Sequence, residues 1–223
     1  MKNPNGKKFS WSPSAINDFL TCPLQYAAKR YYETLPFIET QALRDGNIEH
    51  KHLENRLKLK TPLPKGFDRG EKYCQALEKT GKVTAEFELA LAEDKTFTSW
   101  RKGFGRLKID ALVKKKNKLS IIDWKTGKPK DDLLQLKIYA AVLSLLYPDI
   151  EVFNTRYVWL KFDHTSGAEF YKDEIPGIWQ EIDGHIDRMK QAWLEEDFQP
   201  RPSGLCRNYC AVSACEYCGK GAR

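Results

Sequence analysis

The sequence predicts an α/β fold in which helices flank a mixed β-sheet. Apolar residues recur at helical spacing over the first third of the chain, about residues 12–80. Four later segments alternate apolar and polar residues as half-buried strands do, and a helical segment separates the third of them from the fourth. Strands and helices in this order pack as layers, because each apolar face must be covered by another element.

The composition is that of a globular protein with a basic surplus. The 223 residues are 41% hydrophobic and 30% charged, and the formal net charge is +7. No apolar run approaches the roughly 20 residues that a membrane helix needs, and no apolar signal region follows the N-terminus. We therefore expect a cytoplasmic protein without a membrane partner. A basic excess favours nucleic acid as a partner, although many proteins of this charge bind none.

The N-terminal part is predicted to be helical after a short lead. Residues 1–11 are basic and lack periodicity, so we expect a flexible lead. Ser12 and Pro13 are typical of a helix start, and Cys22 with the proline after it interrupts that helix. Further helices are expected over residues 24–32, 40–60 and 68–80.

The second half of the chain carries the predicted sheet. Strands are expected over residues 84–91, 104–113, 119–125 and 152–162, with a polar hairpin at 114–118. Helices are expected over residues 131–147 and 175–196. We interpret residues 1–223 as a single domain, with a helical N-terminal part at 12–80, a core at 84–162, and a C-terminal helix with a cysteine cluster at 175–223.

Two aspartates and a lysine are expected to meet at one edge of this sheet. Side chains alternate along a strand, so Asp123 and Lys125 lie on one face and Trp124 on the other. A hairpin through residues 114–118 would bring Asp110 beside Asp123. Both aspartates adjoin apolar strand residues, where an unpaired charge would be costly.

Two carboxylates and an ammonium group suit metal-dependent cleavage of a phosphodiester. Carboxylate oxygens bind Mg²⁺ or Mn²⁺, and the ion polarises the phosphoryl group and activates a water. A nearby lysine can orient that water and stabilise the developing negative charge. A bare Asp-x-Lys pattern is short and common, however, and most examples are surface ion pairs, so the neighbouring sequence must decide.

That neighbouring sequence consists of four segments in a fixed order. They are Gly-Asn-Ile-Glu-His ending at His50, Gly-x-Leu-x-x-Asp ending at Asp110, Asp-Trp-Lys-Thr-Gly starting at Asp123, and Gln135 with Tyr139 on one helix face. With these segments the chain resembles, over nearly its whole length, the PD-(D/E)XK nuclease superfamily. Within it the chain is similar to the RecB-like branch, which includes CRISPR-adaptation nucleases and phage-encoded relatives. The resemblance implies a restriction-endonuclease-like core.

The resemblance also implies roles for single residues. It implies that Lys125 is the catalytic lysine and that Gln135 and Tyr139 support the site or contact DNA. The implied metal ligands are the side chains of His50, Asp110 and Asp123 and the carbonyl of Trp124. Many relatives have glutamate where this chain has Asp123, but aspartate also occurs there in the RecB-like branch. Without the family pattern, His50 would be interpreted as an exposed helix histidine. Glu86 and Glu88 share a strand face and are further candidates to face the site.

The clustered cysteines indicate a second metal centre. Cysteines close together in a reducing compartment point to metal binding rather than to disulfides. Cys206, Cys210, Cys215 and Cys218 could bind one Zn²⁺. Alternatively, Cys22 joins Cys206, Cys210 and Cys215 around a [4Fe–4S] cluster, with Cys218 as an alternative ligand. We favour the cluster, because RecB-like relatives often combine one distant N-terminal cysteine with three near the C-terminus. In either case we expect a structural role.

The expected function is that of a Mg²⁺- or Mn²⁺-dependent deoxyribonuclease. The resemblance implies an exonuclease that acts on single-stranded DNA or DNA ends, such as resected duplexes, in repair, recombination or phage DNA metabolism. A structure-specific endonuclease is one alternative. A DNA-binding metal-cluster module without catalysis is another, which the intact set of Asp110, Asp123 and Lys125 argues against.

Overall fold

In the computed structural model, which describes residues 3–130 and 132–220, the chain divides into two units built from interleaved segments. The first unit contains the described residues of Met1–Ile38, Ala90–Arg106 and Ile182–Arg223. The second unit contains those of Glu39–Leu89 and Leu107–Glu181. These units do not follow the predicted division of the chain, because the first two helices pack with the C-terminal segment. No helix in the described part of the chain is both long and apolar enough to span a membrane.

A five-stranded mixed sheet forms the centre of the second unit, with the strand order β1-β2-β3-β4-β5. The strands are β1 (Val83–Leu91), β2 (Gly105–Lys115), β3 (Lys118–Lys125), β4 (Val152–Trp159) and β5 (His164–Tyr171). β2 pairs antiparallel with β3 through the predicted hairpin, β3 pairs parallel with β4, and β4 pairs antiparallel with β5. The parallel pair is connected through α5 (Leu134–Leu146), since parallel strands need a crossover.

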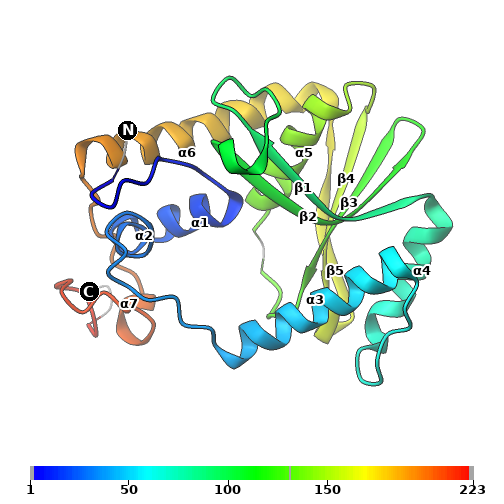
Figure 1. Ribbon diagram of the computed structural model, residues 1–223, viewed down its shortest axis with the longest axis horizontal. Helices are drawn as coiled ribbons and strands as arrows, with labels where there is room; N and C mark the ends of the chain where they lie inside the picture. The colour runs from blue at the N-terminus through cyan, green and yellow to red at the C-terminus, as the bar shows by residue number, and fades with distance from the viewer. Residues whose placement is uncertain (1–2, 131, 221–223) are drawn as a thin grey trace. The chain divides into compact units, whose positions relative to one another are not determined.

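Helices cover both faces of this sheet (Figure 1). α3 (Gln41–Leu59) and α4 (Glu71–Thr80) pack Leu53, Leu57 and Leu77 against one face, and α5 lies on the other. Trp124 belongs to the core beneath α3 and α4 and is only 2% exposed. Because side chains alternate along a strand, Asp123 and Lys125 point away from that core. The α/β class with a mixed sheet flanked by helices is therefore confirmed.

Several predicted boundaries change in the structure. The helix expected from residue 68 begins with a 3₁₀ turn, Asp68–Gly70, before α4. The helix expected over residues 131–147 begins at Leu134, and residue 131 lies outside the described residues. The strand expected over 152–162 ends at Trp159, because Leu160–Phe162 forms a 3₁₀ turn. The C-terminal helix is α6 (Ile175–Glu195), close to the predicted 175–196.

β5 was not predicted, because its sequence is polar and half of its eight residues are exposed. It lies at the end of the strand order, where one long side of a strand is left unpaired. Gly167 has φ +146°, and a Cβ there would approach the carbonyl oxygen of Thr155 to 2.2 Å. Glycine is thus required for the close pairing of β5 with β4, although in the sequence it reads as a strand breaker.

The first unit has an aromatic core. It contains α1 (Pro13–Thr21), α2 (Pro23–Arg30), the C-terminal part of α6 and the short α7 (Leu205–Asn208). The ring of Tyr31 packs against Trp193 and Phe198, with centroids 4.7 and 5.0 Å apart. Ser12 caps α1 by accepting a hydrogen bond from the Ala15 N–H at 3.2 Å.

Asn3, Phe9 and Trp11 are buried, although we expected a flexible lead over residues 1–11, and residues 4–8 between them are exposed. Phe9 and Trp11 are 7% and 3% exposed, and Trp11 pairs with Gly105 through a β-bridge. The side chain of Asn3 donates a 2.6 Å hydrogen bond to the Tyr31 carbonyl. The prediction gave weight to the lysines of this segment, but the two large apolar rings among them stabilise the packed form by burial.

Candidate active site

β2 and β3 separate where the two predicted aspartates lie. The pairing of the strands reaches Ala111 opposite Ile122, one residue before Asp110 and Asp123. Next to this point the backbone N–H of Trp124 donates a 2.7 Å hydrogen bond to Oδ2 of Asp110. A buried N–H needs a partner when strands diverge, and here a carboxylate serves as that partner. The hairpin thus brings both aspartates to one place.

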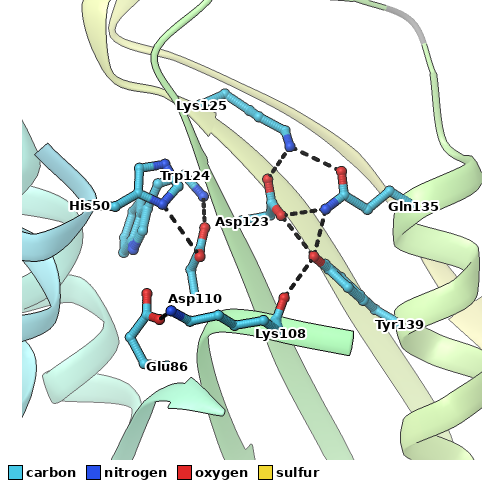
Figure 2. A network of polar contacts seen from close by, with 9 residues as sticks. All are labelled: His50, Glu86, Lys108, Asp110, Asp123, Trp124, Lys125, Gln135 and Tyr139. Atoms are coloured by element: carbon cyan, nitrogen blue, oxygen red, sulfur yellow. Dashed lines mark hydrogen bonds and ion pairs between the residues drawn. The ribbon is translucent and has the colours of Figure 1, made fainter. Parts of the chain in front are cut away.

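Asp123 is held by side chains from β3 and α5 (Figure 2). Its Oδ1 accepts hydrogen bonds from Gln135 Nε2 at 2.8 Å and from the Tyr139 hydroxyl at 3.0 Å. Its Oδ2 lies 2.5 Å from Lys125 Nζ, which also donates to Gln135 Oε1 at 3.0 Å. Gln135 and Tyr139 lie one helical turn apart, so both reach the same carboxylate. Gln135 therefore bridges the predicted catalytic lysine and the predicted metal ligand.

His50 and Glu86 lie on the Asp110 side of the site (Figure 2). His50 comes from α3, and its Nδ1 is 3.5 Å from Oδ1 of Asp110. One ligand atom from each of His50, Glu86 and Asp110 lies within 4.8 Å of the other two. Two carboxylates and an imidazole form a ligand set that suits Mn²⁺ and similar ions.

Glu86 is a site residue that the sequence analysis did not separate from its neighbour Glu88. Strict alternation gives both glutamates the same face of β1, yet Glu88 is exposed and the Glu86 side chain is 8% exposed. Glu86 has a left-handed backbone with φ +52°, which breaks the alternation. Such local kinks re-aim side chains and are frequent beside active sites. Hydrophobic periodicity contains no signal for this conformation.

Two carboxylate oxygens of the site are buried and face ammonium groups. Oε2 of Glu86 contacts Nζ of Lys108, and Oδ2 of Asp123 lies 2.5 Å from Nζ of Lys125. Carboxylate oxygens and an imidazole nitrogen are ligands that divalent ions accept. The donor set of His50, Glu86 and Asp110 therefore fits such an ion. The Trp124 carbonyl stays a predicted ligand.

The negative charges of Asp110 and Asp123 repel each other. Burial and the neighbouring Asp110 raise the pKa of Asp123 above 3.8, against the effect of Lys125. Burial lowers the pKa of His50, but the hydrogen bond and the charge of Asp110 outweigh it, so the pKa is raised overall. Crowded carboxylates beside a histidine gain stabilisation when a divalent cation binds between them.

The glycine of the Gly-x-x-x-His segment, Gly46, is needed because another part of the chain packs closely against it. It lies one helical turn before His50 on α3, and a Cβ at this position would come within 3.0 Å of Thr126 Oγ1. The missing side chain lets the loop that follows Lys125 approach the helix that carries His50.

Four of the five cysteines in the first unit line one small cavity. Cys22, Cys206, Cys210 and Cys215 line it, together with residues of the tail. Cys218 is not among the lining residues, and its thiol donates instead to the carbonyl of Cys210 at 3.5 Å. The structure thus brings the N-terminal cysteine to three of the four C-terminal ones.

Backbone N–H groups point at two of these sulfurs. Arg201 N donates to Cys22 Sγ and Ser203 N donates to Cys206 Sγ, both at 3.4 Å. Among the described residues, no three cysteine sulfurs lie within 4.8 Å of one another.

A model of the PD-(D/E)XK nuclease superfamily matches residues 10–218. A search of curated proteins finds no match. Together with the mixed sheet flanked by helices, the superfamily match confirms the predicted restriction-endonuclease-like fold.

Two solved structures are similar to this chain. A protein from Eubacterium rectale described as a candidate exonuclease has a TM-score of 0.52 and 12% identity, over 88% of this chain and 85% of its own. SSO0001 has a TM-score of 0.45 and 16% identity, over 95% of this chain and 88% of its own. The first similarity is one of fold alone, and the second is too weak to add to it.

Proposed function

The chain belongs to the PD-(D/E)XK nuclease superfamily, and from this membership we propose that it is a Mg²⁺- or Mn²⁺-dependent deoxyribonuclease. The observation that carries the proposal is the convergence of Asp110, Asp123 and Lys125, with His50 and Glu86 beside them. A surface ion pair would not account for the burial of Asp110 and Asp123, which are 8% and 4% exposed.

The proposed chemistry assigns separate tasks to the residues. His50, Glu86, Asp110 and Asp123 would hold a divalent ion, which would supply positive charge to the scissile phosphate and acidify a water. Lys125 would orient the attacking water and stabilise negative charge as it develops on the phosphate. Gln135 would fix the Lys125 ammonium, since its amide contacts both Lys125 and Asp123.

We further propose exonuclease action on single-stranded DNA or DNA ends, in repair, recombination or phage DNA metabolism. The support is the resemblance to RecB-like nucleases and the description of the E. rectale protein as a candidate exonuclease. A cytoplasmic location would suit this substrate. The alternative that keeps the same site is a structure-specific endonuclease.

Cleavage of end-labelled single- and double-stranded DNA tests these proposals. Wild-type protein with Mg²⁺ or Mn²⁺ should release short labelled products from an end, and EDTA should stop the reaction. Internal cuts at branched or flapped sites, without release of end nucleotides, would favour the endonuclease. Lys125→Ala should lose at least about 10²-fold in rate and keep DNA binding. Lys79→Ala, at an exposed position on α4, is the matched control and should keep full activity.

We propose that Cys22, Cys206, Cys210 and Cys215 bind a [4Fe–4S] cluster. Two observations support it: these cysteines line one cavity, and two of their sulfurs accept hydrogen bonds from backbone N–H groups. Hydrogen bonds to thiolate sulfurs are typical of iron–sulfur sites and tune their potential. The cluster would join the start of α2 to the C-terminal tail and so have a structural role.

Anaerobic purification followed by absorption spectroscopy and metal analysis shows whether the cysteine site binds iron or zinc. The proposal predicts a brown protein with broad visible absorption that bleaches on reduction, and about four irons per chain. A colourless protein with one zinc per chain would show that the tail is a zinc knuckle instead.

A further inference from the structure

A large basic cavity in the first unit has no task in the chemistry above. Its volume is about 1220 Å³, and it is lined by the N-terminal segment, α2, the connection between β1 and β2, and α6. Eight lysines and arginines line it, against the two carboxylates of Glu33 and Glu93. We call this cavity the basic hollow. All of its lining residues belong to the first unit, whereas the proposed catalytic residues belong to the second.

Half of the cations in the basic hollow are already paired. Lys7 contacts Glu33, and Lys190 contacts Glu93. Lys29 and Arg30 share a partner outside the lining, Asp18. Exposed pairs of this kind contribute little to stability and exchange readily. These four cations therefore add less to the attraction for an anion than their number suggests.

The other four cations have no carboxylate partner in the described part of the chain. They are Lys8 of the N-terminal segment, Arg101 and Lys102 of the connection after β1, and Arg106 at the start of β2. Four unpaired positive charges around one concave surface repel each other, and an anion relieves that repulsion. The arrangement is complementary to a row of phosphates.

Arg106 is held in place before any ligand binds. Its Nε donates to the Trp100 carbonyl at 2.8 Å, and its two Nη atoms lie 3.4 Å from Ser10 Oγ and 3.5 Å from the Arg101 carbonyl. A guanidinium has five N–H donors, so some remain available to a phosphate. Because the side chain is already ordered, little entropy is lost when it binds.

Aromatic rings line part of the basic hollow. Phe9 packs against Phe104 and Trp193, with ring centroids 5.6 Å apart in both pairs. Trp100 is not a lining residue, but it is 45% exposed and directly precedes Arg101, which is one. An exposed indole beside cations is typical of surfaces that bind unpaired strands.

We propose that the basic hollow binds the sugar-phosphate backbone of a single-stranded DNA segment, through Lys8, Arg101 and Lys102 with Arg106 as a fixed anchor. The inference rests on the proposed nuclease function for its ligand. The phosphates bound here differ from the scissile one, and the contacts carry no sequence information. The hollow would add affinity for strands long enough to offer further phosphates.

The test compares two triple variants by strand binding in EDTA, which prevents cleavage. One combines Lys8→Ala, Arg101→Ala and Lys102→Ala, and the control combines Lys65→Ala, Lys79→Ala and Lys161→Ala. All six residues are exposed, and both variants lower the net charge equally. The first variant should bind a 30-nucleotide strand at least about tenfold more weakly, and its logarithmic salt slope should fall by about 2. Arg101→Lys combined with Lys102→Arg should bind as wild type does.

Equal losses in both triple variants would overturn the proposal, because the effect would then be one of total charge. Unchanged binding by the first variant would overturn it too. Hydrolysis of bis(p-nitrophenyl) phosphate, which has a single phosphodiester, should be the same in both variants and wild type. A further outcome is that the wild-type protein hydrolyses neither DNA nor the small phosphodiester, while only the first triple variant binds DNA more weakly than wild type. In that case the nuclease proposal fails and the proposal for the basic hollow stands.

Discussion

Asp110 on β2 and Trp124 on β3 are joined by a 2.7 Å hydrogen bond from the Trp124 N–H to Oδ2 of the carboxylate. The other oxygen, Oδ1, lies 3.5 Å from Nδ1 of His50. One oxygen thus satisfies a buried backbone donor, while the other lies among the candidate metal ligands. The residue has a structural task and a proposed catalytic task, and different substitutions can separate them.

Asp110→Asn and Asp110→Ala should both abolish DNA cleavage, but only the alanine variant should be destabilised. Asparagine keeps an oxygen that can accept from the Trp124 N–H, whereas alanine leaves that buried donor without a partner, which costs about 1–3 kcal/mol. Urea unfolding of the metal-free proteins measures the difference. Equal stability of the two variants would show that the hydrogen bond does not support the fold.

Asp123→Asn should stabilise the metal-free protein at neutral pH and abolish activity. Burial and the charge of Asp110 raise the pKa of Asp123 in the folded state above 3.8. The folded protein therefore binds a proton more tightly than the unfolded chain does, and wild-type stability falls as pH rises from about 3.8 through the raised pKa. The stability difference between variant and wild type should grow over this range and vanish below it.

The same pair of proteins can be compared with and without Mn²⁺. Saturating Mn²⁺ should raise the unfolding temperature of wild type, since a ligand bound only by the folded state stabilises it. The unfolding temperature of Asp123→Asn should rise little with Mn²⁺, because the variant lacks one of the proposed metal ligands. A difference in stability that does not depend on pH would mean that the Asp123 charge is not unfavourable in the fold.

Gln135→Leu should lower kcat by about 10- to 100-fold and leave KM for DNA nearly unchanged. The amide donates to Asp123 and accepts from Lys125, so its loss leaves the ammonium free to move. Tyr139→Phe should cost less, because Asp123 Oδ1 keeps the Gln135 donor. Steady-state kinetics on one labelled strand measures both. A rise in KM without a fall in kcat would indicate that Gln135 contacts DNA instead.

The catalytic segments could be placed from the sequence because they are local. Asp123 and Lys125 share a face by strand alternation, and one hairpin between adjacent strands brings Asp110 to them. Helical spacing puts Gln135 and Tyr139 on one helix face, but only the resemblance linked that face to the site. His50 was included through the resemblance alone, since nothing local distinguishes it from His52 on the same helix.

Features set by backbone conformation or by contacts remote in the sequence were missed or left open. The choice between Glu86 and Glu88 stayed open, because Glu86 reaches the site through a positive φ that no side-chain pattern encodes. β5 is polar and contains a glycine that only its close approach to Thr155 explains. The N-terminal segment is basic in sequence, yet Phe9 packs on Phe104, ninety-five residues away along the chain.

Arg56→Ala should destabilise the protein by about 2–3 kcal/mol, somewhat less than breaking a fully buried ion pair costs. The guanidinium is 12% exposed and donates to both Glu71 and Glu78, at distances of 2.6 to 3.2 Å. Lys58→Ala removes an exposed pair with Glu54 on the same helix and should cost under about 1 kcal/mol. Urea unfolding at pH 7 compares the two variants.

The Arg56 effect should depend on pH in a defined direction. Hydrogen bonds from Arg56 lower the pKa of Glu71 and of Glu78 below 4.5. Their contribution to stability is therefore present above about pH 4.5 and is lost as pH falls through the lowered pKa values. The gap between wild type and Arg56→Ala should shrink over that range. A gap that stays constant would mean that packing of the side chain, and not its charge, accounts for the loss.

Cys22→Ser and Cys218→Ser distinguish a [4Fe–4S] cluster from a zinc ion at the cysteine site, because each alternative predicts that a different variant loses its metal. Cys22 lines the same cavity as Cys206, Cys210 and Cys215, whereas Cys218 donates to the Cys210 carbonyl. If the centre is a [4Fe–4S] cluster, Cys22→Ser should remove most of the visible absorption and Cys218→Ser should retain it. If the centre is a zinc knuckle, Cys218→Ser should lower the zinc content per chain and Cys22→Ser should leave it unchanged, since Cys218 would be a ligand and Cys22 would not. Cys74→Ser is the control, because Cys74 lies in the core of the second unit and should affect stability without changing the metal content. Equal metal loss in the Cys22 and Cys218 variants, at unchanged folded fraction, would contradict both ligand sets and require five participating thiols.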